Sequence, residues 1–261
     1  MVKNKNLKKF YDNVYSKGEK KHYTHFVVNK KPSSEAIEVS RITSWKNKSV
    51  LDVGCGTGNF CSMISKKGTK RVVGIDYASE AIKIAKKEHK SKNLEFRNIQ
   101  ISQIDEKFDV IVSIGTLEHM DNPYEILKVM KKKLNANGKI IITNPNWTNP
   151  RGYILMTLYH LFKSPITLAD IHYFTPMDHF QMAKKINMKL KWKTIDESWA
   201  SGKVLINDFK RRIPNVIKDS KLPSNKKRID ELIRWLNMNV IPMNNKLKHS
   251  GAIGVYIYSK K

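Results

Sequence analysis

The chain has 261 residues, 40% of them hydrophobic, which is enough for one large domain with insertions or for a domain with a small subdomain. No apolar run reaches the ~20 residues of a membrane-spanning helix, and the Lys- and Asn-rich start contains no apolar segment typical of a secretory signal. The net charge of +26 favours an anionic partner, such as nucleic acid, an anionic membrane surface or an acidic substrate, unless it only reflects an AT-rich genome.

Residues 1–45 are expected to form a helical cap before the main domain. The pattern of residues 4–17 predicts a first helix, with aromatic side chains on or near one face. Ser33 and Ser34 can cap a second helix that runs to about Trp45. The expected buried side of this second helix carries Ile37, Ile42 and Trp45.

Apolar runs then alternate with helical patterns up to residue 144. The expected strands are 49–53, 71–76, 94–99, 108–115 and 139–144. The expected helices are 58–66, 79–90 and 123–133, with an Asn137-Gly138 turn before the fifth strand. This alternation predicts an α/β fold with a doubly wound, Rossmann-like and mainly parallel sheet. Ligands of such sheets bind outside the carboxyl ends of the strands.

The regular alternation ends after residue 144. Residues 145–175 are rich in Pro, aromatic residues and His, and are followed by an expected helix, 176–186, and strand, 188–196. A basic helical insertion is expected over 200–249, before an apolar C-terminal strand, 252–259. The main domain is therefore expected to comprise 46–199 and 250–261.

A glycine-rich turn follows the first expected strand. Residues 50–58 read VLDVGCGTG, and the next apolar run, VVGID, ends in Asp76. Glycine lets the backbone bend sharply, take positive φ and approach a ligand closely. An acid roughly 20 residues after such a turn can accept hydrogen bonds from the two ribose hydroxyls of an adenosine. The two features together predict an adenosine-containing ligand; the alternative is a glycine turn without a ligand.

The turn D-V-G-C-G-T-G closely resembles motif I of the class I S-adenosylmethionine (SAM) methyltransferases. Further along, FDVIVSIGTLEHMDNP followed by LNANGKIIITNPN resembles the ubiquinone-biosynthesis O-methyltransferases and the wider type 11/23 group of small-molecule methyltransferases. The order of elements also fits that fold, whose last strand inserts antiparallel beside the fifth. The match is strong over about residues 45–145 and weak over 150–250. The resemblance implies SAM as the cofactor.

The resemblance also implies which residues hold SAM. Gly54 and Gly56 would line its methionine and ribose portion, and Asp52 would orient the turn or contact the methionyl amino group. Asp76 would accept the ribose hydroxyls, and Tyr77 would pack on the adenine ring.

Three further cofactor residues are implied at the ends of later strands. Ile99 and Gln100 sit where the family contacts the adenine ring and its amino group, and Ile114 would lie under the cofactor. The family often has Asp near Gln100, and this chain has none there, which weakens the role of Gln100.

The candidate catalytic residues are Glu118, His119 and His172. Glu118 and His119 could position or deprotonate a substrate hydroxyl, and His172, beside aromatic residues, could act as the base over the substrate pocket. Each histidine can equally be a structural loop residue, and His179 is a weaker candidate. The ubiquinone-type enzymes carry a further Glu where this chain has Gly115. One Glu and one His make a poor divalent-metal site, so we predict no metal.

The expected function is therefore SAM-dependent methylation of a small molecule at a hydroxyl, with a quinone-like, lipid or sugar acceptor. An RNA methyltransferase is the alternative, favoured by charge alone, and peripheral contact with an anionic membrane is a further expectation. An NAD-dependent oxidoreductase fits less well, because G-x-G-x-x-G would place the third glycine one residue later than Gly58. A non-catalytic SAM-binding module is a fourth possibility. With only Cys55 and Cys61, we expect no disulfide framework and a reducing, cytoplasmic setting.

Overall fold

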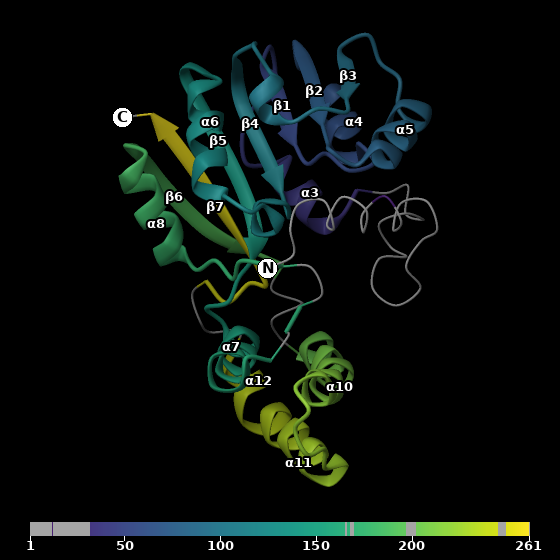
Figure 1. The fold of residues 1–261 in the computed structure, drawn as a ribbon, viewed down its shortest axis with the longest axis vertical. Helices are drawn as coiled ribbons and strands as arrows, with labels where there is room; N and C mark the ends of the chain where they lie inside the picture. The colour runs from purple at the N-terminus through teal and green to yellow at the C-terminus, as the bar shows by residue number, and fades with distance from the viewer. Residues whose placement is uncertain are drawn as a thin grey trace. The chain divides into compact units, whose positions relative to one another are not determined.

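A computed structural model of the chain describes Asp12 and residues 32–164, 166, 167, 170–196, 202–244 and 249–260. The helix expected over 4–17 lies outside these residues. Two compact units make up the chain (Figure 1). The sheet unit comprises Met1–Asn144, His179–Lys191 and Val255–Lys261, and the helical unit comprises Pro145–Asp178 and Trp192–Gly254. The helical unit thus contains the 200–249 region together with 145–178.

Seven strands form one sheet in the order β3-β2-β1-β4-β5-β7-β6 (Figure 1). Their bounds are β1 Ser49–Val53, β2 Arg71–Ile75, β3 Leu94–Arg97, β4 Phe108–Ile114, β5 Leu134–Pro145, β6 Met188–Ile195 and β7 Ile253–Lys260. Strands β1 to β5 pair in parallel. The final strand runs the other way: the N–H of Asn146, after β5, donates to the carbonyl of Ala252, and the N–H of Ala252 donates to the carbonyl of Asp196, after β6. The expected α/β fold with an antiparallel C-terminal strand is confirmed.

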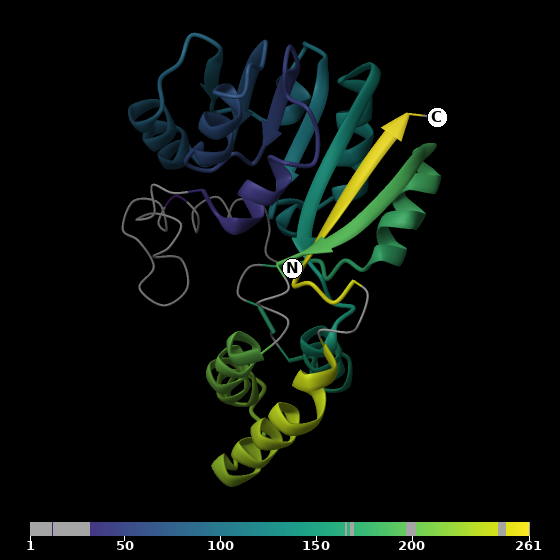
Figure 2. The ribbon, with the colours of Figure 1, turned by 180° about the vertical axis from the view of Figure 1, so that it is seen from behind.

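Helices flank this sheet (Figures 1 and 2). They are α3 Ser34–Val39, α4 Asn59–Ser65, α5 Ser79–Glu88, α6 Pro123–Lys132 and α8 Pro176–Lys185, with 3₁₀ turns at Ile101–Gln103 and Leu117–His119. Strands β1, β2 and β4 are buried almost throughout, and β5 is buried from Ile140 to Asn144, as expected of parallel strands covered on both faces. Their continuous apolar runs, without strict alternation, follow from this burial.

Two boundaries differ from the expectation by five residues or more. Ser33 caps α3 as predicted, since its hydroxyl accepts from the N–H of Ala36 at 3.1 Å, but the helix ends at Val39 and not near Trp45. The buried residues of α3 are Ala36 and Val39, whereas Ile37 is only half-buried. The fifth strand also starts earlier than expected: β5 begins at Leu134, and the Asn137-Gly138 turn is an irregularity within it. Its register against β4 shifts there, because Phe108 pairs with Leu134 and Val110 pairs with Lys139.

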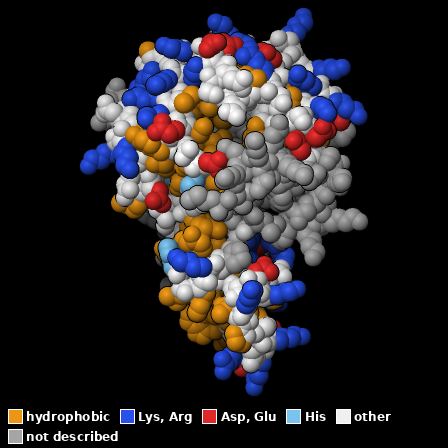
Figure 3. Space-filling model, viewed as in Figure 1, with side chains coloured by type: hydrophobic (Ala, Val, Ile, Leu, Met, Phe, Trp, Pro, Cys, Tyr) orange, Lys and Arg blue, Asp and Glu red, His pale blue; other side chains and the backbone are white. Residues whose placement is uncertain are grey.

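The helical unit has its own apolar core. Its helices are α7 Pro150–Phe162, α10 Gly202–Asp219, α11 Lys226–Trp235 and α12 Ile241–Asn244, with a π-helical turn, Leu236–Val240, between the last two. The buried residues of this core are Trp147, Leu155, Ile166, Leu205, Ile206, Phe209, Ile213, Val216, Ile233 and Leu236. Hydrophobic side chains also gather on the surface of this unit (Figure 3). Among the described residues, no helix is both long and apolar enough to span a membrane.

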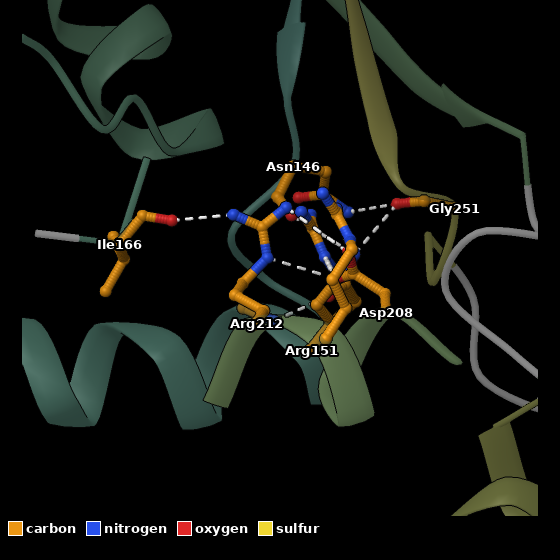
Figure 4. Close-up of polar contacts among 9 residues, drawn as sticks. Asn146, Arg151, Ile166, Asp208, Arg212 and Gly251 are labelled. Atoms are coloured by element: carbon orange, nitrogen blue, oxygen red, sulfur yellow. Dashed lines mark hydrogen bonds and ion pairs between the residues drawn. The ribbon is translucent and has the colours of Figure 1, made fainter. Parts of the chain in front are cut away.

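A buried ion cluster fastens α7 to α10 within the helical unit (Figure 4). Arg151 Nε and Arg212 Nε lie 2.9 and 3.2 Å from Asp208 Oδ2. Arg212 Nη1 also donates to the carbonyl of Ile166 at 2.7 Å, which fixes the chain after α7. Burial by itself would raise the pKa of Asp208, but the charges of Arg151 and Arg212 outweigh it and lower that pKa to about 2. Asp208 is therefore ionised at neutral pH and holds this cluster together.

Candidate cofactor and active site

The glycine-rich turn connects β1 to α4 through three residues with positive φ. Gly54, Gly56 and Gly58 have φ values of 79°, 52° and 80°, a region that residues with a side chain rarely enter. The N–H groups of Gly54 and Cys55 both donate to the carbonyl of Ile75, at 2.8 and 3.0 Å. These bonds hold the start of the turn against the carboxyl end of β2.

Close packing is a second reason for glycine at this turn. A Cβ atom on Gly54 would lie 2.2 Å from Thr116 Cγ2, and one on Gly58 would lie 2.5 Å from Phe96 Cζ. Thr116 follows β4, and its hydroxyl donates to the carbonyl of Ile114 at 2.9 Å. The ends of β1 and β4 therefore approach each other more closely than any side chain on Gly54 would allow.

Asp76 ties the end of β2 to the glycine turn. Its Oδ2 accepts from the N–H of Gly56 at 2.9 Å, and its Oδ1 accepts from the N–H of Ala78 at 2.8 Å. Burial raises the pKa of Asp76, and the hydrogen bonds from Ala78 and Gly56 oppose that rise. A carboxylate offers about four acceptor sites, so both oxygens retain capacity for a second donor each. This arrangement fits the two hydroxyls of a ribose.

Asp52 is a buried carboxyl whose hydrogen bonding is incomplete. Cys61 Sγ donates to its Oδ2 at 3.1 Å, whereas its buried Oδ1 has no partner among the described residues. Burial raises the pKa of Asp52 to about 7, a rise that the bond from Cys61 partly offsets. A buried acceptor without a donor is costly, so this atom fits a ligand that brings a donor or a positive charge, such as an ammonium group.

The remaining expected cofactor residues also follow the parallel strands. Tyr77, directly after Asp76, is half-buried, and burial raises the pKa of its hydroxyl. Ile99 and Ile114, after β3 and at the end of β4, are half-buried, while Gln100 is exposed. The N–H of Gln100 donates to Gln103 Oε1 at 2.9 Å, at the start of a 3₁₀ turn. A direct hydrogen bond thus joins Gly56 to Asp76, whereas the described contact of Gln100 is the local one to Gln103.

Sequence reasoning missed two residues of this region. Thr116 packs over Gly54, as described above, and Asn98 Nδ2 donates to the backbone carbonyl of Asp76 at 2.8 Å. Both are short polar residues that follow a strand, so their place at the ligand-binding edge is visible in the sequence, although their partners are not. Their contacts are made across the sheet, so the local sequence alone does not disclose them.

The expected catalytic residues lie in both units. Glu118 is buried and His119 half-buried, in the 3₁₀ turn after β4. A Cβ atom on Gly115, beside them, would lie 3.9 Å from Glu35 Oε2 and 4.0 Å from Glu118 Oε1, so two carboxyl groups border this loop. His172 belongs to the helical unit, where its ring stacks on Phe174 with centroids 5.3 Å apart. The catalytic roles of these residues stay predictions.

Solved structures with a similar fold are SAM-dependent methyltransferases. One from Archaeoglobus fulgidus matches with a TM-score of 0.59 and 19% identity, over 96% of this chain and 98% of that one. The plantazolicin methyltransferase BpumL, solved with S-adenosylhomocysteine, matches with a TM-score of 0.51 and 18% identity, over 98% and 90% of the two chains. At such identities the likeness concerns the fold alone.

Curated relatives are named ubiquinone biosynthesis O-methyltransferase. The protein of Aeromonas salmonicida is 24% identical over 62% of this chain and 70% of its own length, and that of Pelagibacter ubique is 30% identical over 59% and 69%. The protein of Glaesserella parasuis is 33% identical over 42% of this chain, and the match spans only half of that relative's length.

A family model described as "Methyltransferase domain" matches residues 44–199, which is more than half of the chain. This range contains the glycine turn, Asp76 and the loop with Glu118, and so covers the whole candidate cofactor site. The chain therefore belongs to the family of methyltransferase domains, as an enzyme whose cofactor is SAM.

Proposed function

We propose that the chain transfers the methyl group of SAM to a hydroxyl of a small-molecule acceptor. The observation that carries this proposal is that Asp76 is hydrogen-bonded to the glycine turn at the carboxyl edge of a parallel sheet. The names of the curated relatives support an oxygen acceptor, and a quinone-like molecule, a lipid or a sugar are the candidates.

The cofactor side of the site is assigned as follows. Asp76 accepts hydrogen bonds from the ribose hydroxyls, and the Oδ1 atom of Asp52 accepts one from the methionyl ammonium group. Gly54 and Gly56 let the backbone pass close to the ligand without side-chain clashes, while Tyr77 packs near the adenine. Bound SAM supplies a methyl group on a positively charged sulfur, and the chain's task is to hold it and the acceptor in line.

The acceptor side requires removal of a proton. A hydroxyl that becomes methylated must lose its hydrogen, and a neutral imidazole can accept it at physiological pH. We assign this role to His172, with His119 as the second candidate. Glu118, which is buried after β4, would orient the acceptor or its base. The excess of Lys and Arg supports peripheral contact with an anionic membrane, and RNA is the less favoured acceptor.

Binding and turnover test the proposal separately. Calorimetry should show binding of SAM and S-adenosylhomocysteine and none of NAD. Labelled SAM is then offered with a catechol, a soluble quinol, a sugar, a phospholipid and purified tRNA. Transfer to one of the hydroxyl acceptors supports the proposal. Binding of NAD but not of SAM would favour an NAD-dependent oxidoreductase instead. Stoichiometric label in tRNA alone would favour an RNA methyltransferase.

A further inference from the structure

The last helices of the helical unit carry two apolar stripes, of which only one is buried. Ile233 and Leu236 lie in the core of the unit. Leu232, Trp235 and Met238, each three residues after the last, are 36%, 57% and 73% exposed. Leu232 and Trp235 are neighbours on α11, and Met238 lies in the π-helical turn that follows, so consecutive turns each expose a large apolar side chain to water. A single amphipathic packing role does not account for both stripes.

Helix α7 exposes a second group of large apolar side chains. Leu155 anchors this helix in the core, but Tyr153, Leu161 and Phe162 are 59%, 69% and 50% exposed. Figure 3 shows hydrophobic side chains gathered over α7 and the α11–α12 segment on one face of the unit. A helix that is apolar all round is normally buried in protein or lipid. We refer to Leu161 and Phe162 at the end of α7, with Leu232, Trp235 and Met238, as the apolar docking surface.

Cationic side chains accompany this surface. Residues 202–244 contain ten Lys and Arg against four Asp and Glu. A groove of about 680 Å³ in the same unit is lined by Lys210, Lys226, Lys227, Asp230, Ile233 and Arg234. At the C-terminal end of α7, Lys163 Nζ lies 5.6 Å from the centroid of the Tyr159 ring. Long cationic side chains beside aromatic and aliphatic ones are typical of helices that lie in a membrane interface.

We propose that the apolar docking surface seats the helical unit on an anionic lipid bilayer. The aromatic and aliphatic side chains would enter the headgroup–acyl boundary, and the flanking Lys and Arg would meet lipid phosphates. A second copy of the chain fits this surface less well, because both copies carry the same large positive charge. RNA fits less well too, because Leu and Met side chains gain little from a phosphate backbone. The surface does not include the cofactor residues, so membrane docking is separable from methyl transfer.

Vesicle flotation with the full chain tests this proposal. Vesicles of phosphatidylcholine alone are compared with vesicles that also contain phosphatidylglycerol, and we expect binding to the second kind. Trp235→Ser with Met238→Ser should weaken that binding about tenfold or more, because it removes two side chains that leave water on docking. Phe180→Ser is the matched control: this side chain is 42% exposed, but it lies on α8 in the sheet unit.

Two double variants with the same change in net charge distinguish binding through a local surface from attraction by the overall positive charge of the protein. Lys226→Glu with Lys227→Glu should weaken vesicle binding more than Lys86→Glu with Lys87→Glu, although both pairs change the net charge equally. Lys86 and Lys87 are exposed on α5 in the sheet unit. Equal losses for the two pairs, with no loss for the Trp235 and Met238 variant, would show that charge alone drives binding and would overturn the proposal.

Tryptophan fluorescence provides a second readout, which can be recorded first on the wild type. Anionic vesicles should shift the tryptophan emission of the wild type to the blue, and Trp235→Phe should lose most of this shift. SAM affinity serves as the folding control and should stay unchanged in every surface variant. The proposal fails if anionic vesicles do not bind, if Trp235→Phe keeps the full shift, or if the same variants abolish binding to tRNA while vesicle binding persists.

Discussion

The Nε2 atom of His179 lies 2.8 Å from Asn144 Oδ1, a contact between α8 and the end of β5 that determines the tautomer of this buried imidazole. An amide oxygen only accepts, so Nε2 carries the proton and Nδ1 accepts from the Tyr258 hydroxyl at 2.6 Å. The ring also stacks on Tyr256, with centroids 3.6 Å apart. Burial lowers the pKa of His179 to about 3, so this histidine stays neutral and has a structural role.

His179→Phe should reduce the acid sensitivity of the fold. The folded-state pKa of His179 is about 3, below the ordinary value near 6.5, so its neutral form stabilises the fold above about pH 6.5. This contribution is lost as the pH falls from 6.5 towards 3, by up to ~1.4 kcal/mol per pH unit. Urea unfolding at pH 7 and pH 4 should therefore show a smaller pH-dependent loss in His179→Phe than in the wild type. Equal losses would contradict the assignment.

Asp76→Ala should cost SAM affinity far more than fold stability. The carboxylate is expected to bind both ribose hydroxyls, and two charge-assisted hydrogen bonds at ~1.5–3 kcal/mol each correspond to a loss of roughly a hundredfold to ten-thousandfold. The variant also frees the N–H of Gly56, which loosens the glycine turn. Calorimetry with S-adenosylhomocysteine gives the affinities. Asp105→Ala, an exposed carboxyl of the same unit, is the control and should bind normally.

The sheet and its cofactor edge were largely predictable, because their signals are local. Most of the parallel strands, such as β1, β2 and β4, contain a short apolar run, and the glycine turn is a contiguous motif. The five expected parallel strands exist, and each finishes within about two residues of its predicted carboxyl end. Asp76 was identified for the same reason, since its distance from the turn is set along the chain.

Contacts made across the sheet were not predictable in this way. The contact of Thr116 with Gly54 depends on the pairing of β1 with β4, which the local sequence around either residue does not reveal. The early end of α3 and the early start of β5 were missed because packing, and not propensity, decides them. The buried role of His179 depends on Asn144 and Tyr258, which are 35 and 79 residues away.

Gly54→Ala should destabilise the fold by ~2–4 kcal/mol, from left-handed backbone strain together with a steric clash. The new Cβ would meet Thr116 Cγ2 at 2.2 Å, so adding Thr116→Ser should restore part of the stability. Gly68→Ala measures the strain alone, since its φ is 72° and its nearest neighbour, Lys46 Cγ, is 3.8 Å away. Thermal unfolding compares these three variants with the wild type. If Gly54→Ala costs no more than Gly68→Ala, the close approach of Thr116 is not a constraint.

SAM affinity should rise with pH through about 7 because of Asp52. Its pKa is about 7 before any cation binds, so below that pH the carboxyl is largely protonated and binds an ammonium group less well. Titrations at pH 6 and pH 8 should show tighter binding at the higher pH, with proton release on binding at pH 6. Asp52→Asn should bind SAM more weakly at pH 8 and lose this pH dependence. A pH dependence that persists in Asp52→Asn would assign it to another group.

His172→Ala should slow methyl transfer while leaving SAM binding nearly intact. A positioned general base contributes ~10²–10⁴ in rate, so the loss should appear in kcat and not in SAM affinity. Phe174→Leu is the matched structural control: it removes the ring that stacks on His172 but keeps the imidazole, and should lower the rate far less. His119→Ala and Glu118→Gln are measured beside it. If the rate falls less than threefold for His172→Ala and much more for His119→Ala, the base is His119 in the loop after β4. Glu118 is the buried neighbour that would then orient it.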